Sequence, residues 1–308
     1  MLRSALIAAS RSASFRTLAE RAPVMRPIVD RFVAGDELGQ AIENVRRLTE
    51  DRLVSLDHLG EDTTDRAQAE RTVDAYRALL RTLGEEGLAD RAEVSVKLSA
   101  LGQALPVDGD KIALENTRQI CAAAAAVGTT VTVDMEDHTT TDSTLSIVRE
   151  LRVDFPSTGT VLQAYLKRTE ADCAEFAGPG SRIRLCKGAY DEPASVAYRE
   201  KSEVDASYVR CLKVLMAGQG YPMVATHDPR LVDIAEWMAM QHDRSAEDFE
   251  FQMLYGVRPE AQRALAARGM RLRAYVPYGT EWYPYFMRRL AERPANVAFF
   301  LRSFTSRG

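Results

Sequence analysis

Cysteine is scarce in this sequence, and its four cysteines are not spaced as metal ligands or a disulfide framework would require. They are Cys121, Cys173, Cys186 and Cys211, and no two of them form a C-x-x-C pair. Structural zinc sites and dithiol redox motifs usually depend on such pairs. We therefore expect four reduced thiols, as in a cytosolic protein, and no metal site.

Long apolar runs and excess positive charge are also missing. No run reaches the eighteen or so apolar residues of a membrane-spanning helix, so we expect a cytoplasmic protein with at most peripheral contact to the inner membrane face. The formal net charge is −4, whereas nucleic-acid binding needs a basic face. These absences exclude a membrane-spanning helix and argue against nucleic acid as the main partner.

The first 26 residues are basic, with five arginines opposed only by Glu20. Such a segment is typical of a mitochondrial transit peptide, which would place the protein in the matrix. The alternative is an amphipathic helix over residues 14–33 that packs on the main domain. We favour the helix because periodic apolar residues continue without a break that would suit cleavage.

A regular alternation of short apolar runs and longer helical patterns follows two leading helices, the second at 36–48. Candidate strands lie at 52–56, 93–98, 130–135, 159–166, 182–187, 222–226, 250–254 and 271–276. Helical patterns between them include 65–83, 111–127, 170–176, 196–216 and 231–241. Eight such units predict a (β/α)8 TIM-type barrel, distorted because 170–176 is short.

The alternative architecture is a doubly wound sheet, but no G-x-G-x-x-G follows any candidate strand. We expect one domain, in which helices within residues 1–50 pack on a catalytic barrel formed by residues 51–308.

Polar side chains gather where the candidate strands end, which is where the active site of such a barrel lies. They include Asp57, His58, Lys97, Asp134, Glu136, His138, Gln163, Arg184, Lys187, Thr226, His227, Asp228 and Tyr275. Each of these residues could instead have a structural role. His227, for example, could equally support a neighbouring site residue or contact a ligand itself. Asp134 is expected to be buried after Val-Thr-Val, and Gln163 to need a buried partner.

The segment 285–292 places several polar groups on one stripe of a helix. Tyr285, Arg288, Arg289 and Glu292 fall within about one third of the circumference, and two adjacent guanidinium groups suit bidentate capture of a small carboxylate. The alternative is an ordinary amphipathic helix in which Glu292 pairs with both arginines.

The segment Lys187-Gly-Ala also has two interpretations. It offers a cation and main-chain amides to a pyrophosphate, or it is an ordinary glycine turn.

Together these segments resemble the catalytic barrel of the proline dehydrogenase family, the flavoenzymes that oxidise L-proline. The resemblance covers about 51–300 and is most specific in Tyr285-x-x-Arg288-Arg289-x-x-Glu292. Further support comes from Arg184-Leu-Cys-Lys187-Gly-Ala-Tyr190, Val133-Asp134-Met-Glu136 and Ala225-Thr226-His227-Asp228. The length is similar to that of the short, monofunctional bacterial type.

The resemblance implies three groups of site residues. The substrate site would comprise Lys97, Tyr275, Tyr285, Arg288, Arg289 and Glu292, with the cations on the carboxylate and the tyrosines around the ring. Asp134 and Arg184 would be catalytic, with Arg184 near flavin N5, where positive charge stabilises the reduced anionic flavin. The cofactor site would comprise Met135, Gln163, Arg184, Lys187, Gly188, Ala189, Tyr190, Thr226 and His227.

The implied reaction is oxidation of L-proline to Δ1-pyrroline-5-carboxylate by hydride transfer to N5 of noncovalent FAD. Electrons would pass to a membrane quinone, in the catabolism of proline to glutamate. Asp191 stands where many family members carry an aromatic residue, so the contacts on the adenine side of the FAD are left open.

Three other functions compete with this one. A metal-dependent hydrolase would use Asp57/His58, Glu136/His138 and His227/Asp228 as ligands. A Schiff-base lyase would use Lys97 or Lys187 as the nucleophile. A carboxylate-binding module would need no catalytic group. Neither the hydrolase nor the lyase accounts for paired arginines opposite a tyrosine.

Overall fold

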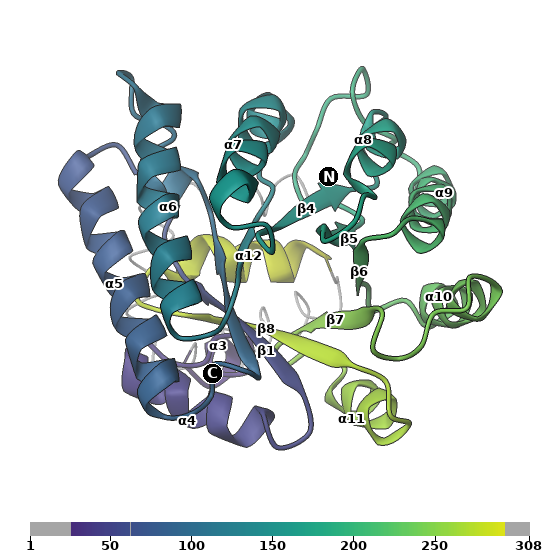
Figure 1. Cartoon of the computed structure of the whole chain (residues 1–308), viewed down its shortest axis with the longest axis horizontal. Coiled ribbons are helices and arrows are strands. Elements are labelled where there is room, and N and C mark those ends of the chain that lie inside the picture. Colours follow the sequence, from purple (N-terminus) through teal and green to yellow (C-terminus); the bar gives the residue numbers. More distant parts are fainter. Residues whose placement is uncertain (1–25, 62, 293–308) are drawn as a thin grey trace, which may run out of the picture.

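The computed structural model describes residues 26–61 and 63–292, with only the backbone for 290–292. Eight parallel strands close into a barrel in chain order, and β8 pairs with β1. Helices surround the barrel (Figure 1). The predicted (β/α)8 fold is therefore confirmed.

The barrel strands are short and mostly buried. They are β1 (Leu53–His58), β2 (Ala92–Val96), β3 (Val131–Val133), β4 (Gly159–Gln163), β5 (Arg182–Cys186), β6 (Tyr221–Ala225), β7 (Glu250–Leu254) and β8 (Leu272–Tyr278). Every residue of β2, β3 and β4 is buried. Parallel strands are covered on both faces, which is why they read as apolar runs in the sequence.

Among the described residues, the helices before β5 are α3 (Arg26–Val29), α4 (Leu38–Leu48), α5 (Arg66–Glu85), η2 (Ser99–Leu101), α6 (Gly109–Ala126), η3 (His138–Thr140), α7 (Thr141–Asp154) and α8 (Thr169–Phe176). Those after β5 are α9 (Lys201–Ala217), α10 (Pro229–Gln241), α11 (Pro259–Ala267) and α12 (Trp282–Glu292). The outer helices bury one face; α5, for example, begins after Asp65, whose side chain accepts from Ala67 N, and buries Tyr76 and Leu79.

Helix α12 does not belong to the outer ring. In Figure 1 it lies inside the ring of helices, across the middle of the view. Its apolar side chains form a cluster with the segment around α3 and with Leu59, separate from the main core. The α3 segment also passes close to the loop after β7, where a Cβ on Gly256 would lie 1.6 Å from Arg31 O. The N-terminal segment thus helps to hold α12 beside the barrel.

The predicted element bounds needed correction at several places that carry polar residues. Strand β2 ends at Val96, so Lys97 follows the strand and does not lie within it. Strand β8 continues to Tyr278, two residues beyond its predicted end, and Tyr275 lies inside the strand, as the predicted bounds also had it. Strand β1 includes Asp57 and His58. The bounds of β7 were predicted correctly.

Two helix predictions also changed. The helix predicted over 196–216 begins only at Lys201, because residues 196–198 pair with the chain after β4: Lys167 N donates to Val196 O, and Tyr198 N to Tyr165 O. Of the helix predicted at 14–33, residues 14–25 lie outside the described residues, and the described part is helical only in α3, which ends at Val29, four residues before the predicted end. The helix after β4 is short, as predicted.

Candidate active site

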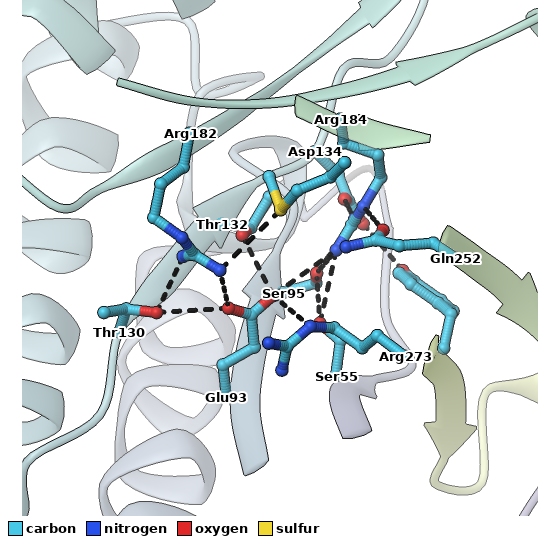
Figure 2. A network of polar contacts seen from close by, with 12 residues as sticks. Ser55, Glu93, Ser95, Thr130, Thr132, Asp134, Arg182, Arg184, Gln252 and Arg273 are labelled. Carbon is cyan, nitrogen blue, oxygen red and sulfur yellow. Dashed lines mark hydrogen bonds and ion pairs between the residues drawn. The ribbon is translucent and has the colours of Figure 1, made fainter. Parts of the chain in front are cut away.

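A buried ion pair between Arg184 and Asp134 lies at the centre of the candidate site (Figure 2). Arg184 extends from β5 and is 5% exposed, and Asp134 follows β3. The guanidinium donates to Asp134 Oδ1 at 2.6 Å and to Ser95 Oγ at 3.0 Å. Asp134 is buried, as its Val-Thr-Val context predicted.

Lys97 and Tyr275 complete this cluster from the other side. The Tyr275 hydroxyl donates to Asp134 Oδ2 at 2.6 Å, and Lys97 Nζ lies 3.3 Å from the same hydroxyl. Lys97 Nζ also binds Asp57 Oδ2 at 2.6 Å, and Arg184 Cζ lies 5.2 Å from the centre of the Tyr275 ring. Four residues that the sequence assigned to catalysis or substrate binding are therefore in mutual contact.

The protonation states of this cluster follow from burial and from neighbouring charges. Burial would lower the pKa of Lys97, but Asp57 and Asp134 outweigh it, and the pKa is raised above its usual value. Burial raises the pKa of Asp134, although Arg184 and Lys97 act in the opposite direction. Burial and Asp134 raise the pKa of Tyr275, so its hydroxyl stays protonated and donates. A Schiff-base nucleophile must be a neutral amine, so a cationic Lys97 argues against Lys97 as the nucleophile of a lyase.

The paired arginines of α12 do not form a solvated face. Arg288 is 12% exposed in its side chain and binds both carboxylate oxygens of Glu61, with Nη1 to Oε2 at 2.8 Å. Its Cζ lies 5.9 Å from the Tyr190 ring centre. Arg289 Cζ lies 5.0 Å from the ring centre of Tyr285, which is buried. The side chain of Glu292 lies outside the described residues.

Glu61 is a site residue that the sequence reasoning missed. It lies in the loop between β1 and α5, and 227 positions separate it from Arg288. Burial would raise the pKa of Glu61, but Arg288 outweighs burial and lowers it, so the group is a carboxylate. No local pattern around Glu61 marks it, because its partner follows the eighth strand.

The residues assigned to the cofactor form a second set beyond Arg184. Gln163 Nε2 donates to Glu136 O at 2.8 Å, which is the buried partner that its position predicted. Lys187 Nζ binds Asp205 Oδ1 at 2.5 Å and Asp228 Oδ2 at 3.3 Å. Lys187 is thus held among carboxylates in this structure, and an anion at this position would have to compete with them.

Gly188 lies in the irregular segment that follows β5. Gly188 has φ +112, and a Cβ there would lie 2.4 Å from the Tyr165 ring, so only glycine fits. Tyr190 is half-buried and Met135 is 7% exposed. Ala189 lies between Gly188 and Tyr190 in the same segment.

Main-chain contacts fix Thr226 and His227. Thr226 Oγ1 accepts from Asp228 N at 3.1 Å. His227 Nε2 accepts from Leu254 N at 2.9 Å, so a neutral His227 carries its proton on Nδ1. The hydrogen bond between His227 and Leu254 connects the ends of β6 and β7.

Comparison with known proteins identifies the family. The family model described as Proline dehydrogenase matches residues 41–302. The chain belongs to the proline dehydrogenase family. Proline dehydrogenase 1 of Bacillus subtilis (strain 168) is 40% identical over 273 residues, covering 88% of this chain and 89% of the relative. Proline dehydrogenase of Deinococcus radiodurans is 40% identical over 296 residues, covering 93% and 95%.

The fold agrees with solved structures of larger proteins. The crystal structure of proline utilization A (PutA) from Bdellovibrio bacteriovorus inactivated by N-propargylglycine has a TM-score of 0.78 and 26% identity, over 86% of this chain. The chain spans about a third of that protein, 32% of its length. As a member of the proline dehydrogenase family of short, monofunctional type, the protein is an oxidoreductase that oxidises proline in proline catabolism.

Glu192 is a second residue that sequence reasoning missed in this proline dehydrogenase. It is 4% exposed, and its carboxylate accepts from His138 N at 3.0 Å and from the Tyr165 hydroxyl at 3.1 Å, and contacts His138 Nδ1. It thus joins the segment after β5, which carries Tyr190, to the segments after β3 and β4.

The metal-dependent hydrolase finds no support in the geometry. Among residues 26–61 and 63–292, no group of three or more His, Cys, Asp or Glu residues is arranged to hold a metal ion. His138 contacts Glu192, and His227 Nε2 accepts a hydrogen bond from Leu254 N.

Among residues 26–61 and 63–292, no helix is long and apolar enough to cross a membrane.

Proposed function

We propose that this proline dehydrogenase oxidises L-proline to Δ1-pyrroline-5-carboxylate with noncovalent FAD, and that a membrane quinone takes the electrons. The observation that carries the proposal is the convergence of Lys97, Asp134, Arg184 and Tyr275 in one buried cluster. This cluster suits a two-electron oxidation of a small anionic amine, because it supplies fixed cations for a carboxylate and for an electron acceptor that gains charge.

The donor set at the ends of β4, β5 and β6 fits a flavin in its chemistry. Bound FAD would supply the acceptor for the hydride that leaves the ring carbon next to the proline nitrogen. Arg184 would face the ring system with its positive charge. The amide nitrogen of Gln163 is bound to Glu136 O, so the carbonyl oxygen of Gln163 would accept from the flavin ring. The remaining cofactor contacts would come from Met135, Lys187, Gly188, Ala189, Tyr190, Thr226 and His227.

Lys187 supports a pyrophosphate site only with a rearrangement of its partners. Lys187, Lys201 and Arg230 surround the carboxylates of Asp205 and Asp228. The pyrophosphate of FAD carries two negative charges in all, and on entering this group it would replace carboxylate partners of Lys187.

The substrate carboxylate would bind to Arg288 and Arg289, with Lys97 as a third cation. Because both outer nitrogens of Arg288 contact Glu61, substrate entry would require Arg288 to exchange Glu61 for the incoming carboxylate. Tyr275 and Tyr285 would enclose the ring, and Glu292 would hold the two guanidinium groups.

The residues of the site also favour the neutral form of the substrate amine. Hydride can leave the adjacent carbon only when the nitrogen lone pair is available. Lys97 and Arg184 are fixed cations beside Asp134, and nearby positive charge disfavours a protonated amine, as does burial. The chain therefore contributes orientation, exclusion of water and release of the amine proton.

An absorbance spectrum tests the proposal directly. The purified protein should carry the flavin absorbance, and anaerobic addition of L-proline should bleach it. Cyclopentanecarboxylate has the same ring and carboxylate but no amine, so it should bind without bleaching. A protein that does not retain FAD, or whose FAD is not reduced by L-proline, would contradict the proposal.

A further inference from the structure

A glutamine from β7 holds the guanidinium of Arg184 from the side away from Asp134. Gln252 is 3% exposed, and its Oε1 accepts from Arg184 Nε (Figure 2). Its amide nitrogen donates to Glu250 Oε1 at 2.5 Å. Because the oxygen faces a cation and the nitrogen faces a carboxylate, the orientation of the amide is fixed by both neighbours.

Gln252 also lies between Arg184 and the carboxylate of Glu250. Asp134 is the carboxylate in hydrogen-bond contact with Arg184, while Gln252 and Ser95 are uncharged acceptors. Glu250 is instead paired with Arg273, at 2.6 and 3.0 Å.

Glu93 lies farther from Arg184, with Oε1 at 3.7 Å from Nη2, and its carboxylate binds Arg182 at 2.6 Å. Uncharged acceptors therefore complete the hydrogen bonding of Arg184 without cancelling its charge.

We propose that Gln252 is a positioning residue for the electron-transfer chemistry: it fixes the plane of the Arg184 guanidinium and offers Nε an uncharged acceptor, so that Asp134 is the carboxylate that hydrogen-bonds to Arg184 and Glu93 stays at 3.7 Å. The inference rests on the proposed FAD function, and it adds a residue that does not touch the substrate or the acceptor. A glutamate at this position would keep an acceptor for Nε but would add a second carboxylate in hydrogen-bond contact with Arg184. The reduced, anionic flavin would then be less stabilised relative to the oxidised form.

The test is the reduction potential of FAD bound to Gln252→Glu, measured by equilibration with a reference dye. We expect the equilibrium for flavin reduction to fall at least tenfold, which is about 30 mV for a two-electron couple. The new carboxyl group would lie between the Arg184 cation and the Glu250 carboxylate, so the potential is measured from pH 6 to pH 9 to compare its protonated and ionised forms.

Gln262→Glu is a matched control. Gln262 is also buried and accepts from an arginine, Arg52 Nη1 at 3.1 Å, but it lies on α11 outside the barrel. Its variant should retain the wild-type potential across the same pH range. An equal lowering in both variants would show a general effect of a buried carboxyl group and would overturn the proposal.

Gln252→Met is a second variant that removes the acceptor and adds no charge. It should change the potential by less than a third of the effect of Gln252→Glu. It should also slow flavin reduction at saturating proline about tenfold with an unchanged KM, because the guanidinium is no longer fixed.

A folded Gln252→Glu with wild-type potential at every pH would overturn the proposal. If that variant does not fold, a wild-type reduction rate in Gln252→Met would do so. A wild-type protein that binds no FAD would instead contradict the proposed function.

Discussion

Glu136 is a carboxyl group whose ionisation should cost the protein stability at neutral and higher pH. It follows β3, and its oxygens accept from Ser99 N at 3.0 Å and Ser99 Oγ at 2.6 Å. Burial raises the pKa of Glu136 from 4.5 to about 7, more than the Ser99 hydrogen bonds lower it. The perturbation we propose is Glu136→Gln, which keeps the shape of the side chain and cannot ionise.

The size of the effect follows from the two pKa values. Their difference of about 2.5 is equivalent to about 3.4 kcal/mol, at about 1.36 kcal/mol per unit. Because the folded protein holds the proton more tightly than the unfolded chain, stability is lost as the pH rises from 4.5 through 7. About 2.5 kcal/mol of this loss falls between pH 5 and pH 8. This is an upper limit, since Glu136 is only partly buried as a residue.

The assay is the free energy of unfolding from urea titrations of both proteins at pH 5 and pH 8. The stability of Glu136→Gln relative to wild type should increase by up to about 2.5 kcal/mol between the two pH values. Glu260→Gln is a control, because the Glu260 side chain is 82% exposed and should give no such difference. If Glu136→Gln and wild type keep a constant difference at both pH values, the assigned pKa is wrong.

Five further substitutions, at four residues, test the site. Arg288→Ala or Arg289→Ala should raise the KM for proline about 10- to 100-fold, the worth of a charged hydrogen bond, and leave FAD bound; a colourless variant would contradict the clamp. Lys97→Met leaves the buried Asp57 without its cation and should cost about 3–5 kcal/mol in chemical unfolding, so a neutral outcome would refute this pairing. Glu192→Gln should cost about 1–3 kcal/mol and raise the KM, and Glu192→Asp should restore part of both if the carboxylate holds the segment.

The fold was predictable because its determinants are local. Each strand of a parallel barrel is covered on both faces and therefore forms a short apolar run, which is visible without any knowledge of its neighbours. The same reasoning identified Asp134 and Gln163, since a polar residue next to such a run must be buried with a partner.

The exact ends of the strands were less predictable, and this changed where Lys97 lies. Lys97 belongs to a run whose apolar pattern continues beyond the hydrogen-bonded ladder of β2, whereas the ladder of β8 continues two residues beyond its predicted run. The pairing between neighbouring strands decides where a ladder ends, and it joins residues far apart in the sequence. A pattern in one run cannot contain that information.

Glu61, Glu192 and Gln252 were missed for a related reason. Each acts on a site residue from another βα unit: Glu61 on Arg288, Gln252 on Arg184, and Glu192 on the segments after β3 and β4. Glutamate and glutamine at such positions read as ordinary polar residues. Only the closed barrel brings them to their partners.

The pair between Glu61 and Arg288 makes substrate binding a replacement of one carboxylate by another. Both side chains are mostly buried, so removing Glu61 leaves a buried cation, which should cost about 3 kcal/mol or more. In Glu61→Gln a bound carboxylate would restore the missing charge, whereas in wild type it must displace one. Cyclopentanecarboxylate should therefore raise the Tm of Glu61→Gln more than that of wild type. Equal shifts in the two proteins would mean that Arg288 binds the ligand without leaving Glu61.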